Sequence, residues 1–206
     1  MKKCLFITFE GSEGSGKSTQ ARLAFHYLKN KKFPVIFLRE PGGVAISEAI
    51  RKILLEVKNT RMTDECETLL YMAARSQVIE EVIVPALKKG KVVLCDRFLD
   101  STVVYQGYGN GVDIDFIKTL GQFVTKGISP DLTLLFDIET KRGLSRKGSV
   151  KDRIELRSLA YHQRVRNGYL QLAKANSQRI KVIKVNKDKE KIFEIVRGYI
   201  DRLLGI

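Results

Sequence analysis

Residues 4–23 read CLFITFEGSEGSGKSTQARL, and this stretch decides the fold. An apolar run ends at Glu10, a loop with three glycines follows, and Lys17 and Ser18 open a segment of helical character. The loop fits the pattern G-x-x-x-x-G-K-[ST] in full. A glycine-rich turn between a strand and a helix lets backbone N–H groups point inward and hold phosphate oxygens. The stretch therefore predicts a phosphate-binding loop, or P-loop.

The P-loop and the first residues of the helix are candidates for binding a nucleoside triphosphate. Lys17 is expected to reach the terminal phosphates, and the Ser18 hydroxyl is expected to bind Mg²⁺. The alternative, a glycine-rich turn followed by a surface lysine, does not account for a full match placed between a strand and a helix. The candidate residues are Gly11, Ser12, Glu13, Gly14, Ser15, Gly16, Lys17, Ser18 and Thr19.

Short apolar runs alternate with longer helical patterns along the rest of the chain. Because several runs are continuously apolar, they are typical of strands buried on both faces, and the alternation predicts a parallel sheet with helices on both faces. The expected strands are Cys4–Phe9, Val35–Leu38, Val92–Cys95, Leu132–Phe136 and Ile180–Val185. The expected helices are Lys17–Asn30, Ala45–Glu56, Asp64–Lys89, with Pro85 as a kink or in its last turns, Asp113–Thr125, Glu155–Ala175 and Lys189–Leu204.

The composition is that of a soluble protein with one large domain. The chain has 206 residues, of which 44% are hydrophobic and 29% charged. No apolar run approaches the ~20 residues needed to span a bilayer, so no membrane partner is expected, and the short run after Lys3 is interpreted as a first strand rather than a signal peptide. Three widely spaced cysteines predict neither a disulfide framework nor a zinc site. A reducing cytoplasm is the expected location.

The net charge of +14 is open to three interpretations. A basic surface can bind nucleic acid, attract polyanionic substrates, or simply be a solvated face. The chain lacks the stripe of interleaved aromatic and arginine residues that would stack bases. We therefore expect no nucleic-acid partner.

Polar residues follow two further strands, at the edge of the sheet where ligands of such folds bind. Asp96 ends one strand and can support Mg²⁺, directly or through water, and Arg97 follows it. Arg39 and Glu40 end another strand before Pro41 and two glycines; Arg39 could hold a second phosphate, and Glu40 could orient it or contact water around the metal. Alone, either motif is also consistent with an ordinary turn or surface ion pair.

Two other segments have a functional and a purely structural interpretation. Tyr71 and Arg75 lie four residues apart on one helical face, where they could stack a base and grip a phosphate, or serve the core and the surface. The basic stretch from Lys141 to Arg153 contains two glycines. It could close over a triphosphate and exclude water, or be a solvated loop. A closing cover fits phosphoryl transfer better than a hydrolytic switch.

Together these segments resemble the bacterial thymidylate kinases of the nucleoside-monophosphate kinase superfamily. The resemblance covers nearly the whole chain and rests on EGSEGSGKST, REPGG, LLYMAARSQ, VPALKKGKVVLCDRF, DSTVVYQG, SPDLTLLFDI, and DRIE followed by RVRNGYLQLA. It implies an α/β fold of the P-loop NTPase type: a five-stranded parallel sheet, helices on both faces and a short lid. Residues 1–206 would form one kinase domain, with the lid at about 141–153, and usually a homodimer. The implied reaction is the ATP- and Mg²⁺-dependent phosphorylation of dTMP to dTDP, with ADP as the other product, in dTTP synthesis.

The resemblance also implies roles position by position. Lys17, Arg97, Arg146 and Glu13 would be catalytic, with Glu13 near the acceptor sugar and metal-bound waters. Ser18 and Asp96 would serve Mg²⁺. In the dTMP site, three arginines would hold the phosphate, Tyr71 would stack on thymine, and Tyr105 would pack against deoxyribose. The full dTMP-binding set is Arg39, Tyr71, Arg75, Arg97, Ser101, Thr102, Tyr105 and Gln106, in which Thr102 and Gln106 would recognise the base edge.

The lid and the P-loop depart from the common family pattern together. The P-loop carries Ser12-Glu13 and no arginine, and family members of this kind carry that arginine in the lid. Arg146 matches the compensating position and would bind ATP, with Arg153 behind it. The lid reads GLSRKGSVKDRIE and is short, which leaves open which lid cation contacts ATP.

Three rival functions are separable by simple assays. Another kinase on the same fold would prefer a different acceptor, although three arginines favour one that already carries phosphate. A nucleic-acid-binding ATPase would hydrolyse ATP in response to DNA or RNA and bind them in a salt-sensitive way. A GTPase-like switch would need Asn-Lys-x-Asp, whereas Asn186-Lys187-Asp188 places the aspartate one residue too early. We interpret that segment as a loop flanking the adenine.

Overall fold

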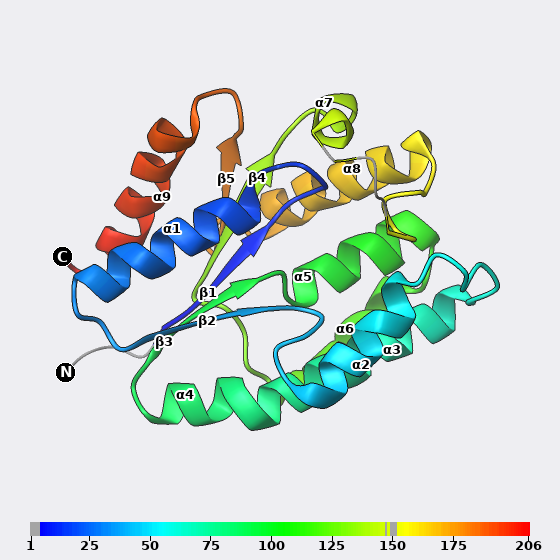
Figure 1. The fold of residues 1–206 in the computed structure, drawn as a ribbon, viewed down its shortest axis with the longest axis horizontal. Coiled ribbons are helices and arrows are strands. Elements are labelled where there is room, and N and C mark those ends of the chain that lie inside the picture. The colour runs from blue at the N-terminus through cyan, green and yellow to red at the C-terminus, as the bar shows by residue number, and fades with distance from the viewer. Residues whose placement is uncertain (1–4, 147, 149–151) are drawn as a thin grey trace.

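A computed structural model describes residues 5–146, 148 and 152–206. Its five strands form one parallel sheet, as expected from the sequence, and their order is β2-β3-β1-β4-β5 (Figure 1). The strands are β1 (Leu5–Glu10), β2 (Val35–Arg39), β3 (Val92–Asp96), β4 (Leu132–Asp137) and β5 (Ile180–Lys184). Each lies within one residue of its expected bounds, and Cys4 falls outside the described residues.

Helices cover both faces of the sheet, as Figure 1 shows. They are α1 (Lys17–Asn30), α2 (Ala45–Leu55), α3 (Asp64–Val78), the π-helix η1 (Ile79–Ile83), α4 (Val84–Lys88), α5 (Leu99–Thr102), the π-helix η2 (Val103–Asn110), α6 (Ile114–Thr125), α7 (Thr140–Ser145), α8 (Leu159–Ala175) and α9 (Lys189–Leu204).

The core divides between the two faces because successive strand residues point to opposite sides. In β1, Leu5, Ile7 and Phe9 pack with the buried residues of α1 and α9. Phe6 points the other way, into a cluster built with η1 and α4. All six residues of β1 are buried, which explains why the strand is mostly apolar before its terminal carboxylate; the one other polar residue, Thr8, hydrogen-bonds to the Thr133 hydroxyl on β4.

Several helical segments differ from the sequence expectation. The helix expected to start at Glu155 begins at Leu159 instead, because the Ser158 hydroxyl caps its first turn by accepting from the Tyr161 backbone N–H. The long third helix passes through π-helical geometry at η1, and Pro85 lies in the first turn of α4. The segments α5–η2 and α7 were not expected as helices. In the loop expected to flank adenine, Asp188 caps α9.

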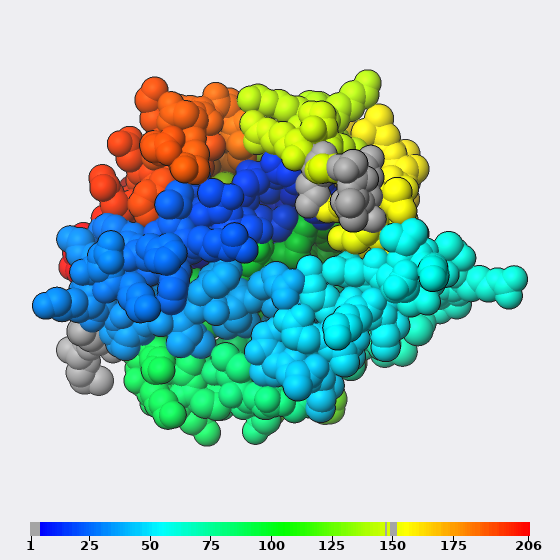
Figure 2. Space-filling view, viewed as in Figure 1, coloured from blue at the N-terminus to red at the C-terminus, as the bar shows by residue number. Residues whose placement is uncertain are grey.

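The strand register brings the functional segments to one edge of the sheet. Asp96, the last residue of β3, is level with Arg39 of β2 and with Phe9 of β1. The P-loop, the turn after β2 and the start of α5 therefore leave the sheet next to one another. Figure 2 shows a hollow on this side, between α1 and the P-loop in blue and the cyan helices α2 and α3. No helix in the described part of the chain is long and apolar enough to cross a bilayer.

Candidate active site

Two glycines of the P-loop have backbone conformations that only a residue without a Cβ adopts easily. Gly14 and Gly16 have φ values of 68° and 82°, in the left-handed region. Gly14 also approaches the backbone of α7: a Cβ on Gly14 would lie 1.9 Å from the carbonyl oxygen of Gly143. A Cβ on Gly143 would in turn lie 2.4 Å from the carbonyl oxygen of Glu13. The P-loop and the first helix of the expected lid therefore pack backbone against backbone.

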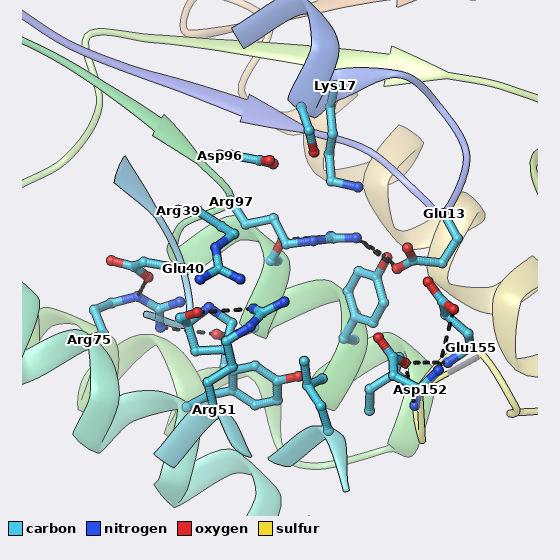
Figure 3. Close-up of a pocket in the computed structure, with 18 of the residues that line it drawn as sticks. Glu13, Lys17, Arg39, Glu40, Arg51, Arg75, Asp96, Arg97, Asp152 and Glu155 are labelled. Carbon is cyan, nitrogen blue, oxygen red and sulfur yellow. Dashed lines mark hydrogen bonds and ion pairs between the residues drawn. The ribbon is translucent and has the colours of Figure 1, made fainter. Parts of the chain in front are cut away.

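Lys17, the first residue of α1, lies in the pocket with only 7% of its surface exposed. Burial lowers the pKa of its ammonium group, and so does the positive charge of Arg97, while Glu13 and Asp96 act in the opposite direction. Figure 3 shows Lys17 and Asp96 on the same side of the pocket, with Arg97 beside them. Lys17 is thus available to a phosphate at the mouth of the P-loop.

One pocket brings together residues from segments that are far apart in the chain (Figure 3). It contains every residue assigned above to dTMP binding, together with three from the P-loop and α1 and the metal candidate of β3. The lining residues among the sequence candidates are Glu13, Lys17, Ser18, Arg39, Tyr71, Arg75, Asp96, Arg97, Ser101, Thr102, Tyr105 and Gln106.

Arg97 is held on several sides at the end of β3. Its backbone has φ 72°, which is uncommon for a residue with a side chain, and its N–H donates to the Phe9 carbonyl oxygen at 3.0 Å. The guanidinium donates to Glu13 Oε1 at 2.7 Å and to the Tyr105 hydroxyl at 2.9 Å. The same Tyr105 hydroxyl donates to Glu13 at 2.8 Å. Arg97 is therefore oriented before any ligand arrives.

The second terminal nitrogen of Arg97 contacts a buried hydrogen-bonded cluster that the sequence analysis did not predict. This nitrogen donates to Ser101 Oγ at 3.1 Å and to the Tyr169 hydroxyl at 3.3 Å. Both hydroxyls donate to Glu10 Oε2, at 2.6 and 2.8 Å, and the Phe98 N–H donates to Oε1. Burial, and then the charge of Asp100, raises the pKa of Glu10 to about 7, against the pull of Arg97.

The two remaining arginines are paired with carboxylates. Arg75 is buried and donates to Glu40 at 2.8 Å and to the Thr102 hydroxyl at 2.9 Å. Burial raises the pKa of Glu40, although Arg75 opposes this. Arg39 is half-exposed and donates to Glu48 at 2.8 Å. The Gly43 N–H donates to the same oxygen of Glu48, and this hydrogen bond is the main cause of the lowered pKa of Glu48.

Glu40 has a partner that the sequence did not predict. The sequence suggested that it orients a phosphate or contacts water around the metal. In the structure Glu40 Oε2 pairs with Arg75 in a buried ion pair, whereas Oε1 is buried without a hydrogen-bond partner among the described residues, and the side chain lines the pocket.

The base-edge candidates lie around a second buried carboxylate. Gln106 donates through Nε2 to Glu67 Oε1 at 2.9 Å, and Asn110 donates to the same oxygen at 3.1 Å. On α3, Glu67 lies one helical turn before Tyr71, and the Tyr71 side chain is partly buried. Arg153, expected behind Arg146 in the lid, is buried and pairs with Glu67. It therefore lies beside Gln106, one of the residues expected to bind dTMP, rather than behind Arg146.

The segment expected to form the lid is described only in part. Arg146 is exposed, and its guanidinium lies 3.4 Å from the Gly14 carbonyl oxygen, which places it over the P-loop. Residues 147 and 149–151 of the expected lid fall outside the described residues. Asp152 and Glu155 line the pocket opposite Arg39 (Figure 3), and burial raises the pKa of Asp152.

Several residues in or beside the pocket carried only weak signals in the sequence. Arg51 lines the pocket from α2 and donates to the Pro41 carbonyl oxygen at 3.0 Å. Glu67 is four residues before Tyr71, a helical spacing that could have placed it on the same face. Glu10 directly precedes the P-loop, but Tyr169 is far away in sequence, and nothing local connects the two.

Two buried polar atoms indicate where a cation and a phosphate would be accommodated. Asp96 Oδ1 and Ser15 Oγ are buried and have no hydrogen-bond partner among the described residues. Buried polar atoms are normally satisfied, so both are suited to a ligand. The described residues contain no cluster of three or more His, Cys, Asp or Glu side chains arranged for a metal. Mg²⁺ bound by one or two protein oxygens, phosphates and water needs no such cluster.

Comparisons with known proteins agree with this geometry. Residues 9–196 match the family model described as thymidylate kinase. The thymidylate kinase of Kosmotoga olearia is 48% identical over 194 residues, which cover 93% of each chain. The thymidylate kinase of Geotalea daltonii is 46% identical over 211 residues, covering 97% of this chain and 98% of that protein.

A solved structure extends the likeness from sequence to fold. The crystal structure of thymidylate kinase from Ehrlichia chaffeensis superposes with a TM-score of 0.80 at 33% identity, covering 97% of this chain and 99% of the other. Family model, relatives and fold agree over almost the whole length. This chain therefore belongs to the thymidylate kinase family.

Proposed function

We propose that dTMP lies in the pocket with its phosphate toward the P-loop and its base toward α3 and η2. The reaction follows from the family: the enzyme phosphorylates dTMP to dTDP with ATP as the donor. The observation that carries the assignment is that Lys17, Arg39 and Arg97 line one pocket at the strand ends. The P-loop binds ATP there, and the guanidinium groups of Arg39 and Arg97 bind the phosphate of dTMP.

The acceptor needs little activation in this arrangement. A phosphate oxygen is already anionic near neutral pH, so the residues act by aligning the two nucleotides and neutralising charge. Arg97 and Arg39 hold the dTMP phosphate in line, and Lys17 and Arg146 act on the γ-phosphate of ATP. Arg75 contributes from the buried wall of the site, where its charge is already balanced by Glu40. Glu13 orients Arg97 and faces the acceptor sugar.

The chain provides suitable residues for Mg²⁺. The unpartnered Asp96 Oδ1 and the Ser18 hydroxyl face the P-loop region, and both are oxygen ligands of the kind Mg²⁺ prefers. When bound, the ion would neutralise charge on the β- and γ-phosphates. Replacing Asp96 with Asn should raise the Mg²⁺ concentration needed for half-maximal activity. Unchanged Mg²⁺ dependence would remove Asp96 from the metal site.

The base and sugar lie against the aromatic and polar wall of the pocket. Tyr71 stacks on thymine, Tyr105 packs against deoxyribose, and Gln106 and Thr102 meet the base edge, with Ser101 beside them. These residues line one cavity and are buried or partly buried, so a mismatched base would leave polar groups unpaired.

A homodimer is supported by an exposed apolar face on two neighbouring helices. On α6, Phe116 and Phe123 are 51% and 80% exposed, and on α3, which packs against α6, Leu69 is 52% exposed. Large apolar groups gathered on adjacent helices are typical of an interface. A Phe123→Glu variant should elute as a monomer in size exclusion with light scattering, whereas Val182→Glu, at an exposed site on β5, should not change the mass.

A cytoplasmic location is supported by the thiols. Cys66 and Cys95 are both free. Free cysteines persist in the reducing cytoplasm, where disulfides are rare.

An acceptor panel tests the function most directly. Release of ADP with ATP and Mg²⁺ should be fast with dTMP and slow with dCMP, dAMP and dGMP. The rival nucleic-acid-dependent ATPase predicts ATP hydrolysis that DNA or RNA stimulates without any nucleoside monophosphate. That second result would overturn the assignment.

A further inference from the structure

Glu67 is a fully buried carboxylate that joins two parts of the molecule. It lies on α3, has 0% exposure, and receives hydrogen bonds on both oxygens. Oε1 accepts from the side-chain amides of Gln106 and Asn110 on η2. Oε2 accepts from the guanidinium groups of Arg153 and Arg157, which compensate its charge. Burial of a carboxylate is costly unless it is paired in this way.

The carboxylate fixes which end of the Gln106 amide faces it. An ionised carboxylate can only accept hydrogen bonds, so the Gln106 group that contacts Glu67 must be the NH₂ group. The 2.9 Å contact is from Nε2 to Oε1 of Glu67. The amide carbonyl is therefore left for the pocket, which Gln106 lines together with Tyr71 and Thr102. The side chain offers the pocket an acceptor rather than a donor.

An acceptor at this position distinguishes pyrimidines by their N3 atom. Thymine and uracil carry a hydrogen at N3, whereas N3 of cytosine is itself an acceptor. If the Gln106 carbonyl faces N3, it accepts a hydrogen bond from thymine or uracil. With cytosine, the lone pairs of the carbonyl oxygen and of N3 would face each other. A site built around such a hydrogen bond rejects the wrong partner strongly, because the buried groups stay unpaired.

We propose that Glu67 is a specificity-determining positioning residue, which sets the orientation of the Gln106 amide and so selects bases that carry N3–H. The inference rests on the proposed function, in which Gln106 meets the base edge. Glu67 acts through Gln106 and does not touch the nucleotide. Arg153 and Arg157 contribute to this positioning, because they bind the other oxygen of Glu67 and keep the carboxylate from turning.

Glu67→Gln tests the proposal because the two arginines dictate how the new amide lies. They need an acceptor, so the carbonyl of Gln at 67 must face them and its NH₂ must face Gln106. Gln106 then has to turn its carbonyl toward residue 67 and its NH₂ toward the base. We expect kcat/KM for dTMP and dUMP to fall by the same factor, and the dCMP to dTMP ratio of kcat/KM to rise at least about tenfold.

A merely structural role for Glu67 gives a different result. If kcat/KM for all three monophosphates falls by one common factor, or if none changes, the proposal is overturned. Asn110→Ala is the matched control, because it removes the other amide bound to Glu67 Oε1 and leaves Gln106 in place. Its dCMP to dTMP ratio should equal that of the wild type.

Two further measurements keep the test decisive. If Glu67→Gln does not fold, inhibition of the wild-type enzyme by nucleosides replaces it: deoxyuridine should compete at least about tenfold better than deoxycytidine, and equal competition refutes the proposal. Gln106→Met distinguishes the role of Gln106 at the base edge from the role of Glu67 in positioning it. If pyrimidine preference survives in Gln106→Met, the base-edge assignment is wrong. If preference is lost there but kept in Glu67→Gln, only the role of Glu67 is wrong.

Discussion

The backbone contact between the P-loop and α7 gives a prediction in which two known effects oppose each other. Replacing Gly143 with Ala should favour α7, since glycine inside a helix costs about 1 kcal/mol relative to alanine. The added Cβ, however, would lie 2.4 Å from the Glu13 carbonyl oxygen and 3.1 Å from Ile138 Cγ2. The Glu13 oxygen belongs to the backbone and cannot swing aside as a side chain would.

The size of the required movement decides the outcome. An ordinary contact for this Cβ begins at 3.4 Å, so the P-loop and α7 must separate by about 1 Å. Overpacking of this kind costs about 1–3 kcal/mol, which equals or exceeds the helix gain. Because Glu13 holds Arg97 and the loop is proposed to bind ATP, a shift of about 1 Å should lower kcat/KM by on the order of 10²-fold.

The assay compares Gly143→Ala with Gly198→Ala in α9. An added Cβ at Gly198 meets nothing within 4 Å, so this variant reports the helix effect alone and should raise Tm by about 2–4 °C without changing kcat/KM. Gly143→Ala should lose activity and gain no Tm. Wild-type kcat/KM in Gly143→Ala, together with the same rise in Tm, would show that α7 does not pack on the P-loop in the working enzyme.

Three other perturbations follow from the site. Lys17→Met should lose about 3 kcal/mol or more of transition-state stabilisation, read from kcat/KM, and near-normal turnover would refute its assigned role. Arg146→Ala should lower kcat far more than it weakens dTMP binding, measured by calorimetry; poor dTMP binding with normal kcat at saturation would place Arg146 on the acceptor side. Glu10 should make stability fall as pH rises: its folded pKa of about 7 exceeds the ordinary 4.5, so the folded state holds an extra proton between these values. Between pH 4 and 8 the loss is on the order of 3 kcal/mol, and denaturant unfolding of Glu10→Gln should lack it; parallel pH profiles for the two proteins would contradict the assignment.

The sheet was predictable because its signals are local. A strand buried on both faces must be continuously apolar, and each of the five runs was visible without knowledge of its neighbours. The glycines and Lys17 of the P-loop are likewise consecutive in sequence. Residues at the ends of β2 and β3 could be placed near them because parallel strands end at one edge.

The helical segment α5–η2 was missed because its own sequence argues against a helix. STVVYQGYGN is rich in glycine and β-branched residues, which have low helix propensity. Tertiary packing overrides this preference: Cβ positions on Gly107 and Gly109 are already crowded by Ile114 and Tyr161. The glycines are needed there for close packing rather than for a turn.

Ion pairs between distant segments were also beyond the sequence. Arg153 is followed by apolar and acidic residues in a basic region, which suggested a lid cation, yet its partner Glu67 is 86 positions away. Glu40 and Arg75 are separated by 35 positions. Charge spacing shows such partners only within one helix.

The register of the sheet end has an evolutionary consequence. Arg39, Asp96 and Arg97 are each at most one residue from a hydrogen-bonded strand, so the positions of their backbones depend on the packing of the sheet. Arg146, the cation expected on the donor side, is attached differently, at the C-terminal end of α7. Substitutions there can redistribute cations without refolding any strand. The absence of an arginine from the P-loop, together with Arg146 at the end of α7, is the kind of sequence change that can occur without altering a strand.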